Sequence, residues 1–300
     1  MEIKNVLVPT DFSVPSKMAV NYGIALARRF RAKLILLHVV GVQPLLSEAA
    51  EVDPHLEEEL GEKALQQLSE LVAPEDQDDL GLQTVIKFGG VQKAILNTVK
   101  EQNADLVVLG THGHGRIGRW ILGSTTEGIL RKLTIPVLTV RETRQMNFGR
   151  ILFATDLSES SVQALDFVLD LAKTLQAEII AIHTLDKRMI SSVEEPVRDD
   201  LHDMAAKQAK EKLAMIATEG RRRGIDVSTT LAEGTAADEI LKCAREVDAD
   251  LILIATTSKG AIERALIGAT AERVVREAHL PVLCVPAKTA ARPQAIRRTS

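Results

Sequence analysis

The most constraining feature of this sequence is an internal repeat that covers nearly its whole length. Val8-Pro-Thr-Asp-Phe-Ser13 reappears as Phe153-Ala-Thr-Asp-Leu-Ser158, at an offset of 145 residues. The same offset relates His38 to His183, Gly89 to Gly234, Asp105 to Asp250 and Gly123 to Gly268. A chain of this length accommodates two ordinary domains. The repeat therefore predicts two tandem domains, residues 1–142 and 149–286, followed by a disordered tail at 287–300.

Within each repeat, short apolar segments of strand length alternate with longer segments of helical period. In the first repeat the apolar segments are Asn5–Val8, Lys33–Val39, Gln83–Phe88, Asp105–Leu109 and Pro136–Val140. Strands that alternate with helices favour parallel pairing through crossover helices. The sequence thus predicts an α/β fold in which each domain has a five-stranded parallel sheet with helices on both faces. Ser158 stands where the N-cap of the first helix of the second repeat is expected.

Composition narrows the classes of function. The net charge of -4 and an aromatic content of 3% argue against nucleic-acid binding. No apolar run reaches the roughly 18 to 20 residues of a membrane-spanning helix, and the first residues lack the features of a signal peptide. We therefore expect a cytoplasmic protein with neither nucleic-acid nor membrane partners. Cys243 and Cys284 lack metal-type spacing, so buried structural thiols are expected.

Residues 110–124 form a glycine-rich segment between an apolar run and a helical pattern. Glycines occupy positions 110, 113, 115, 118 and 123. A loop that leads into a helix presents backbone N–H groups and a positive helix end to an anion such as phosphate. Residues 113–118 satisfy the dinucleotide pattern G-x-G-x-x-G, but that fingerprint belongs after the first strand, with an acidic residue about 20 positions further on. A Walker A loop would need Gly-Lys followed by Ser or Thr, and tight turns alone explain only part of the glycine content.

The spacing Gly110-x-x-Gly113, nine residues, then Gly123-Ser124 is similar to the ATP-binding signature of the universal stress protein family, G-x-x-G-x9-G-[S/T]. Pro9-Thr10-Asp11 after the first strand, His38-Val39 at the end of the second and Pro136–Val140 as the last strand also resemble that family. The resemblance covers both repeats. It implies the adenine nucleotide alpha hydrolase-like, Rossmann-like form of the α/β fold.

The resemblance also implies which residues bind ATP. Asp11, with Pro9 and Thr10 beside it, is expected to border the adenine and ribose, and the backbone of Val39 to read the adenine edge. The other implied positions, most of them around the triphosphate and its Mg or Mn ion, are Leu109, Gly110, His112, Gly113, Gly123, Ser124, Thr125 and Thr126. No residue is assigned a catalytic or metal-ligating role, because His112 and His114 lack a third ligand and fit hydrogen-bonding groups better.

The second repeat departs from this signature. Ala255 and Ser258 replace two of its glycines, and Ala269 replaces Ser124. Added side-chain atoms and a lost hydroxyl group should weaken phosphate binding by a few kcal/mol, on the order of a hundredfold or more. We therefore expect one competent ATP site, in the first domain. Ser124 through Glu127 also satisfies the capping-box pattern, so a hydroxyl cap at this helix start is predicted as well.

Three functions fit these observations. The first is an ATP-binding stress or regulatory protein in which nucleotide occupancy changes conformation or partner choice. The second is a slow ATPase or phosphotransfer enzyme, for which His112 and His114 are the nearest candidate bases. The third is a scaffold or a lipid or small-molecule carrier with incidental ATP binding. Because family dimers pair through their last strands, residues 137–140 and 282–285 are expected to form a pseudo-dimer within the chain, with pairing between chains as the alternative.

Overall fold

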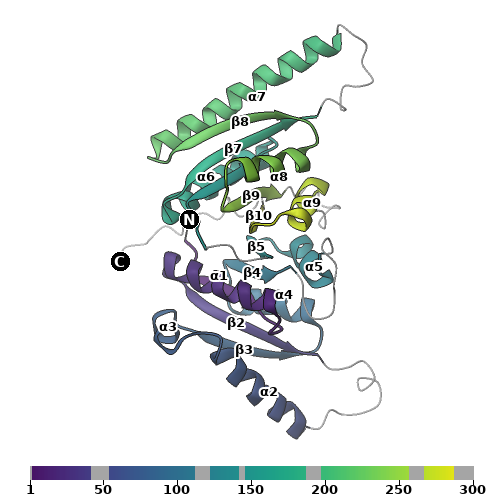
Figure 1. The fold of residues 1–300 in the computed structure, drawn as a ribbon. Coiled ribbons are helices and arrows are strands. Elements are labelled where there is room, and N and C mark those ends of the chain that lie inside the picture. The colour runs from purple at the N-terminus through teal and green to yellow at the C-terminus, as the bar shows by residue number, and fades with distance from the viewer. Residues whose placement is uncertain are drawn as a thin grey trace, which may run out of the picture.

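Ten strands, five from each half, join into one sheet in the described part of the chain (Figure 1). This computed structural model describes residues 2–41, 54–111, 122–141, 146–186, 197–256 and 267–286. The strands are β1 (Asn5–Pro9), β2 (Lys33–Val40), β3 (Gln83–Phe88), β4 (Leu106–Gly110), β5 (Val137–Val140), β6 (Arg150–Ala154), β7 (Glu178–Leu185), β8 (Val227–Glu233), β9 (Leu251–Thr256) and β10 (Val282–Pro286). Their order across the sheet is β3-β2-β1-β4-β5-β10-β9-β6-β7-β8.

Helices cover both faces of this sheet. They are α1 (Val14–Phe30), α2 (Pro54–Ser69), α3 (Pro74–Asp79), α4 (Val91–Glu101), α5 (Ser124–Lys132), α6 (Glu159–Leu175), α7 (Val197–Arg222), α8 (Ala236–Glu246) and α9 (Ala269–Glu277). The buried side chains of α1, α2, α6 and α7 pack in one core cluster, and those of α4, α5, α8 and α9 pack in another. Each core therefore runs through both halves, on its own side of the sheet.

Within each half the strands pair in parallel, which confirms the predicted fold class. The fourth strand starts at Leu106, one residue after the predicted start. The reason is that the Asp105 carboxylate accepts hydrogen bonds from the backbone N–H groups of Lys4 (2.9 Å) and Asn5 (3.1 Å). Asp105 thereby ties the start of β4 to the start of β1.

The two halves join through their last strands, as predicted. Strands β5 and β10 pair antiparallel, and Leu138 lies opposite Leu283, its own counterpart in the repeat. The Thr139 hydroxyl group donates a hydrogen bond to the carbonyl oxygen of Val282 at 3.1 Å. Since each of these strands also pairs with a strand of its own half, both edges of β5 and β10 are occupied. In this arrangement neither strand leaves an edge open to a strand of another chain.

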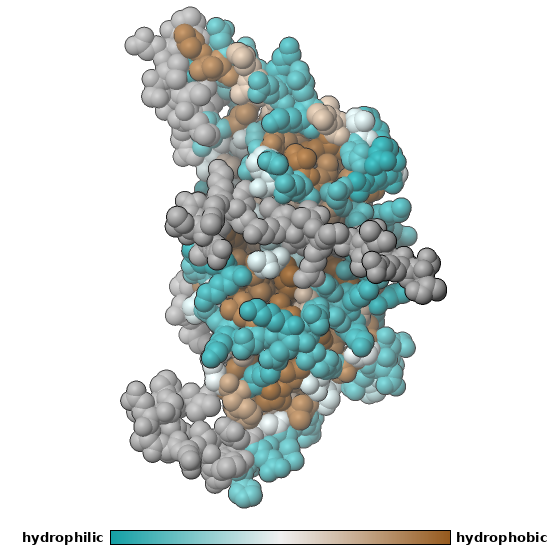
Figure 2. Space-filling view, turned by 180° about the vertical axis from the view of Figure 1, so that it is seen from behind, coloured by the Kyte–Doolittle hydropathy of each residue, from teal (hydrophilic) through white to brown (hydrophobic). Residues whose placement is uncertain are grey.

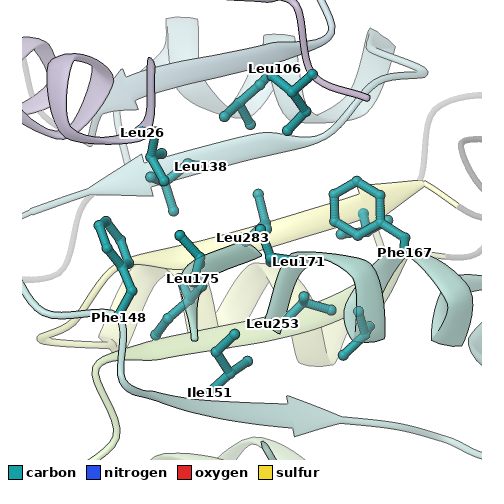
Figure 3. Packing of buried hydrophobic residues seen from close by; sticks show 14 of the residues in the cluster. Leu26, Leu106, Leu138, Phe148, Ile151, Phe167, Leu171, Leu175, Leu253 and Leu283 are labelled. Carbon is teal, nitrogen blue, oxygen red and sulfur yellow. The ribbon is translucent and has the colours of Figure 1, made fainter. Parts of the chain in front are cut away.

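An apolar cluster covers the junction between the halves (Figure 3). Leu138 and Leu283 lie at its centre, at 1% and 4% exposure, and Phe148 and Phe167 flank them. The ring of Phe148 also meets Tyr22 of α1 edge-on, with centroids 5.9 Å apart. The hydrophobic core is thus continuous between the halves.

Four further sequence predictions concern the cap of α6, the two cysteines, membrane-spanning helices and the last residues of the chain. Ser158 caps α6 as predicted, because its side chain accepts a hydrogen bond from the N–H of Ser161 at 3.3 Å. Cys243 and Cys284 are both buried free thiols, which confirms the predicted burial. Among the helices that the structure describes, none combines the length and apolar character that a bilayer crossing needs. Residues 287–300, expected to form a disordered tail, lie outside the described residues.

The outer surface alternates between polar and apolar regions. Figure 2 shows the side turned away from the viewer in Figure 1, where hydrophilic residues cover much of the surface and hydrophobic residues gather in patches between them. Exposed large apolar side chains include Val162 of α6 and Met204 and Met215 of α7. The described surface therefore carries apolar patches besides its charged regions.

Candidate functional site

A hydrogen-bonded turn follows β1 at the carboxyl end of the sheet. One carboxylate oxygen of Asp11, Oδ1, accepts hydrogen bonds from the N–H (3.1 Å) and the hydroxyl group (2.5 Å) of Ser13. Ser13 is also the N-cap of α1, where its side chain accepts from the N–H of Ser16 at 3.4 Å. The side chain of Asp11 is therefore fixed against the start of α1.

Phe12 within this turn has a left-handed backbone, with φ of 62°. Its N–H donates to the hydroxyl group of Thr10 at 3.1 Å, and that hydroxyl group lies 2.9 Å from the hydroxyl group of Ser16. Positive φ is uncommon for a bulky side chain and is stable only where neighbouring contacts fix it. These contacts hold the turn in one conformation.

His38 on β2 connects the second strand to the same turn. Its ring Nδ1 lies 2.9 Å from the carbonyl oxygen of Thr10, and since a carbonyl can only accept, Nδ1 carries the proton. The rings of His38 and Phe12 are in contact, with centroids 4.5 Å apart. The backbone of Val39, the next residue on β2, is thereby placed beside the β1 turn.

Two hydrogen bonds close the base of the glycine-rich segment. The N–H of Gly123 donates to the carbonyl oxygen of Thr111 at 3.0 Å. The hydroxyl group of Thr126 donates to the carbonyl oxygen of Gly110 at 3.1 Å, and its side chain is buried. The end of β4 and the start of α5 are therefore adjacent, although ten residues of sequence separate the described parts.

Gly110 is a glycine because α1 packs directly against it. A Cβ atom at this position would lie 2.8 Å from the carbonyl carbon and oxygen of Pro15 and 2.9 Å from the backbone N of Ser16. Real Cβ contacts are longer, so only glycine fits without moving α1. The close approach at Gly110 is thus to protein backbone, whereas the sequence suggested an approach to phosphate.

The predicted capping box at the start of α5 is wrong. The helix begins at Ser124, so its N-cap is Gly123, which has extended backbone and no side chain with which to cap. Glu127, the predicted partner, instead forms an ion pair with Arg131 at 2.8 Å. The competing interaction is that of Thr126 with Gly110, which sets where the helix can begin. The first N–H groups of α5 therefore have no partner within the helix and no capping side chain.

The second half repeats the β1 turn but changes the helix start. Asp156 Oδ1 accepts from the N–H of Ser158 (3.0 Å) and the hydroxyl group of Ser161 (2.6 Å). Burial raises the pKa of Asp156, but these hydrogen bonds outweigh it, and the pKa lies below its ordinary value. At the start of α9, by contrast, Gly268 has φ of 81° and Ala269 and Ala271 stand where Ser124 and Thr126 supply hydroxyl groups.

The structure brings most of the predicted residues together at one edge of the sheet. Pro9, Thr10, Asp11, Val39, Leu109 and Gly110 lie at the ends of β1, β2 and β4, and Gly123, Ser124, Thr125 and Thr126 lie at the start of α5. Thr10, Leu109 and Thr126 are buried, and the side chain of Ser124 is exposed. The remaining predicted residues, His112 and Gly113, lie outside the described residues, as do His114 and Ser258.

Three residues of the site were missing from the sequence prediction: Phe12, Ser13 and Ser16. Ser13 carried a usable signal, because a serine just before a helix that begins Val-Pro is a typical N-cap. Phe12 and Ser16 carried none, since their roles depend on the backbone of the turn and on packing against β4.

Few acidic or metal-ligating side chains gather at this edge among the described residues. The described part of the chain contains no group of three or more His, Cys, Asp or Glu side chains that could hold a metal ion. In α5, the acidic residue is Glu127, which is held by Arg131. What the described residues offer at this edge is the backbone N–H groups at the start of α5, the Asp11 carboxylate and the exposed Ser124 hydroxyl group.

Comparison with known proteins places this arrangement in a family. The sequence model of the universal stress protein family matches the chain twice, at residues 2–141 and 147–286. The chain belongs to the universal stress protein family. A universal stress protein of Methanocaldococcus jannaschii is 32% identical over 139 residues, which are 46% of this chain and 82% of that protein. One from Mycolicibacterium smegmatis is 25% identical over 293 residues, covering 93% of this chain and 96% of that protein.

The fold of this tandem universal stress protein is also similar to solved structures. A universal stress protein of Archaeoglobus fulgidus superposes with a TM-score of 0.68 at 23% identity, over 96% of this chain and all of that one. At this level of identity the likeness shows the fold alone. Both halves of the chain, the one with the intact signature and the one without it, therefore have the family fold.

Proposed function

We propose that this protein is a cytoplasmic regulator of the stress response whose first half binds ATP together with a Mg²⁺ or Mn²⁺ ion, and that occupancy of this site changes its conformation or its choice of partner. The observation that carries the proposal is the uncapped start of α5, which is joined to the end of β4, while the end of β4 packs against the start of α1 that holds Asp11. Ligands of open parallel sheets bind at this carboxyl edge.

The start of α5 fits the phosphate groups. Its first N–H groups lack partners within the helix, and the positive end of the helix dipole attracts an anion. The exposed hydroxyl group of Ser124 adds a further donor. Hydrogen bonds to charged groups contribute about 1.5–3 kcal/mol each, so these donors favour a phosphate over a neutral group. From the family signature, His112 and Gly113 are proposed to complete this end of the site.

The β1 turn fits the adenosine part. The carboxylate of Asp11 can accept hydrogen bonds from ribose hydroxyl groups while Ser13 holds it in place. Pro9, Thr10, Val39 and Leu109 border the same space through their main chains, because the side chains of Thr10 and Leu109 are buried. When bound, the metal ion would neutralise charge on the phosphate oxygens.

The proposal gives the protein one ATP site. The second half retains the aspartate turn but lacks the hydroxyl groups of Ser124 and Thr126 and has a different backbone at the helix start, Gly268 in place of Gly123. Two equivalent sites are therefore not expected.

Isothermal titration of the full chain with ATP and Mg²⁺ tests the proposal, with Asp11→Asn and Asp156→Asn as a matched pair. Asparagine keeps the oxygen that each serine contacts but removes the charge. We expect one ATP per chain, an affinity about tenfold lower or worse for Asp11→Asn, and no change for Asp156→Asn. No binding by the unmodified protein would refute the ATP site, and two equal sites would refute its restriction to the first half.

A further inference from the structure

A second feature of the first half is a groove between α4 and α5 that is lined with lysine side chains. The groove has a volume of 670 Å³, and its lining includes Lys93 and Lys100 of α4 and Lys132 of α5. All three lysines are exposed. Lys93 and Lys100 lie two helical turns apart, about 10 Å along the axis of α4. Positive charge is therefore spread along the groove.

The acidic residues of the two helices pair with other cations. Glu101, the acidic residue of α4, forms an ion pair with Lys87 of β3 at 2.8 Å. Glu127, that of α5, pairs with Arg131 at 2.8 Å. The Nζ of Lys132 lies 3.5 Å from the neutral amide oxygen of Gln92. The groove thus keeps a net positive charge.

The second half supplies an internal comparison at the same positions. Lys93 corresponds to Asp238, Lys132 to Glu277, and Gly128 to Arg273. Arg273 forms hydrogen bonds with both acids, with Nε 3.0 Å from Glu277 Oε1 and Nη1 3.1 Å from Asp238 Oδ2. The guanidinium group of Arg273 therefore links α8 to α9 and offsets one of the two negative charges.

The first half cannot form this network. Gly128 has no side chain, and the amide group of Gln92 lies over it, 2.5 Å from where a Cβ would stand. Gln92 corresponds to Ala237, which leaves room for Arg273 in the second half. The same scaffold therefore carries an ion-paired bridge between its helices in one half and an open basic groove in the other.

We propose that the α4/α5 groove of the first half binds an acidic segment of a partner protein. Charges about 10 Å apart are too far apart for one phosphate group, but they match carboxylates distributed along a peptide. Leu96 lies between the lysines, and Val91 is 40% exposed, so apolar side chains of such a segment also find contact. The groove is separate from the proposed nucleotide site except at Thr125, and the proposal holds without ATP.

Fluorescence anisotropy of the full chain with a fluorescein-labelled peptide, in which glutamate alternates with neutral residues including leucine, tests this proposal in the absence of nucleotide. We expect binding that weakens as NaCl is added, because exposed ion pairs are screened. Lys93→Asp with Lys132→Glu introduces the charges of the second half and should weaken binding about tenfold or more. A peptide with glutamine in place of glutamate should not bind.

Two further variants distinguish loss of the groove from a general change in charge and from loss of the fold. Lys207→Asp with Lys210→Glu makes the same charge change on exposed positions of α7 and should alter the affinity less than about twofold. Gln92→Ala, Lys93→Asp, Gly128→Arg and Lys132→Glu together transplant the network of the second half, so this variant should fold and fail to bind. Thermal unfolding of each variant checks the fold.

Four outcomes would overturn the proposal. They are no binding of the peptide to the unmodified protein, equal binding to the groove variant, groove-dependent binding of inorganic tripolyphosphate in place of the peptide, and self-association that the groove variant abolishes. The third outcome would identify a small-anion site, and the fourth would make a second copy of the chain the occupant. Light scattering measures self-association, and none of these results depends on whether the protein binds ATP.

Discussion

Replacing Gly110 with alanine would test why the first half has a glycine at the end of β4. The added methyl group would lie 2.8 Å from the carbonyl carbon and oxygen of Pro15 and 2.9 Å from the N of Ser16. All three are main-chain atoms, so a side-chain rotation cannot relieve the contact, and α1 must shift. Forcing an extra carbon into a packed interior typically costs about 1–3 kcal/mol. We expect a loss of this size in the free energy of unfolding.

Denaturant unfolding followed by circular dichroism measures this loss, and the melting temperature should fall by a few degrees. The shift of α1 also moves Ser16, which contacts Thr10 next to Asp11, so the affinity for ATP should fall as well. Ala255→Gly in the second half is the matched control, with an expected loss of about 1 kcal/mol or less. If Gly110→Ala leaves the stability unchanged but abolishes ATP binding, the packing argument is refuted. Gly110 would then be a glycine because a phosphate group approaches its backbone.

Two further predictions concern titratable groups. Complete burial raises the pKa of Cys284 to about 12, so its thiol should react with Ellman's reagent only after unfolding, and rapid reaction in the native protein would contradict its position. For Asp156, hydrogen bonds from Ser158 and Ser161 outweigh burial and hold the pKa below the ordinary 3.8. Its stabilising contribution is present above that value and is lost as the pH falls through the folded-state pKa. The difference in free energy of unfolding between wild type and Asp156→Asn should therefore shrink from pH 6 to pH 3. A difference that stays constant would contradict the lowered pKa of Asp156.

The sequence predicts most of the fold because the same pattern of apolar and helical segments occurs in both halves. Alternating apolar and helical segments specify the five strands of each half, and the apolar last strands specify the junction. Helix α3 was not predicted, since it spans only six residues, none of them buried, and has no hydrophobic period to detect. The shift of β4 to Leu106 depends on where the Asp105 side chain finds donors, which only the folded sheet shows.

The site was less predictable than the fold because several of its residues act through backbone and packing. The family resemblance assigned Asp11, Gly123 and Ser124 to one site, and in the structure they lie at one edge of the sheet. The sequence pattern could not show that Phe12 adopts a left-handed conformation. Leu157 repeats this feature in the second half, with φ of 57°. The sequence pattern also favoured a cap by Ser124, because a local pattern says nothing of the bond from Thr126 to Gly110.

The pairing of β5 with β10 makes the second half a permanently attached partner of the first. Two separate chains that pair through such strands come apart on dilution, whereas covalent linkage makes the contact independent of protein concentration. Deleting the second half would expose the edge of β5, with the apolar side chains of Val137 and Leu138 beside it, to uncontrolled association. A half that has lost the phosphate signature thus still has a structural role, because β10 covers the edge of β5 whether or not that half binds a ligand.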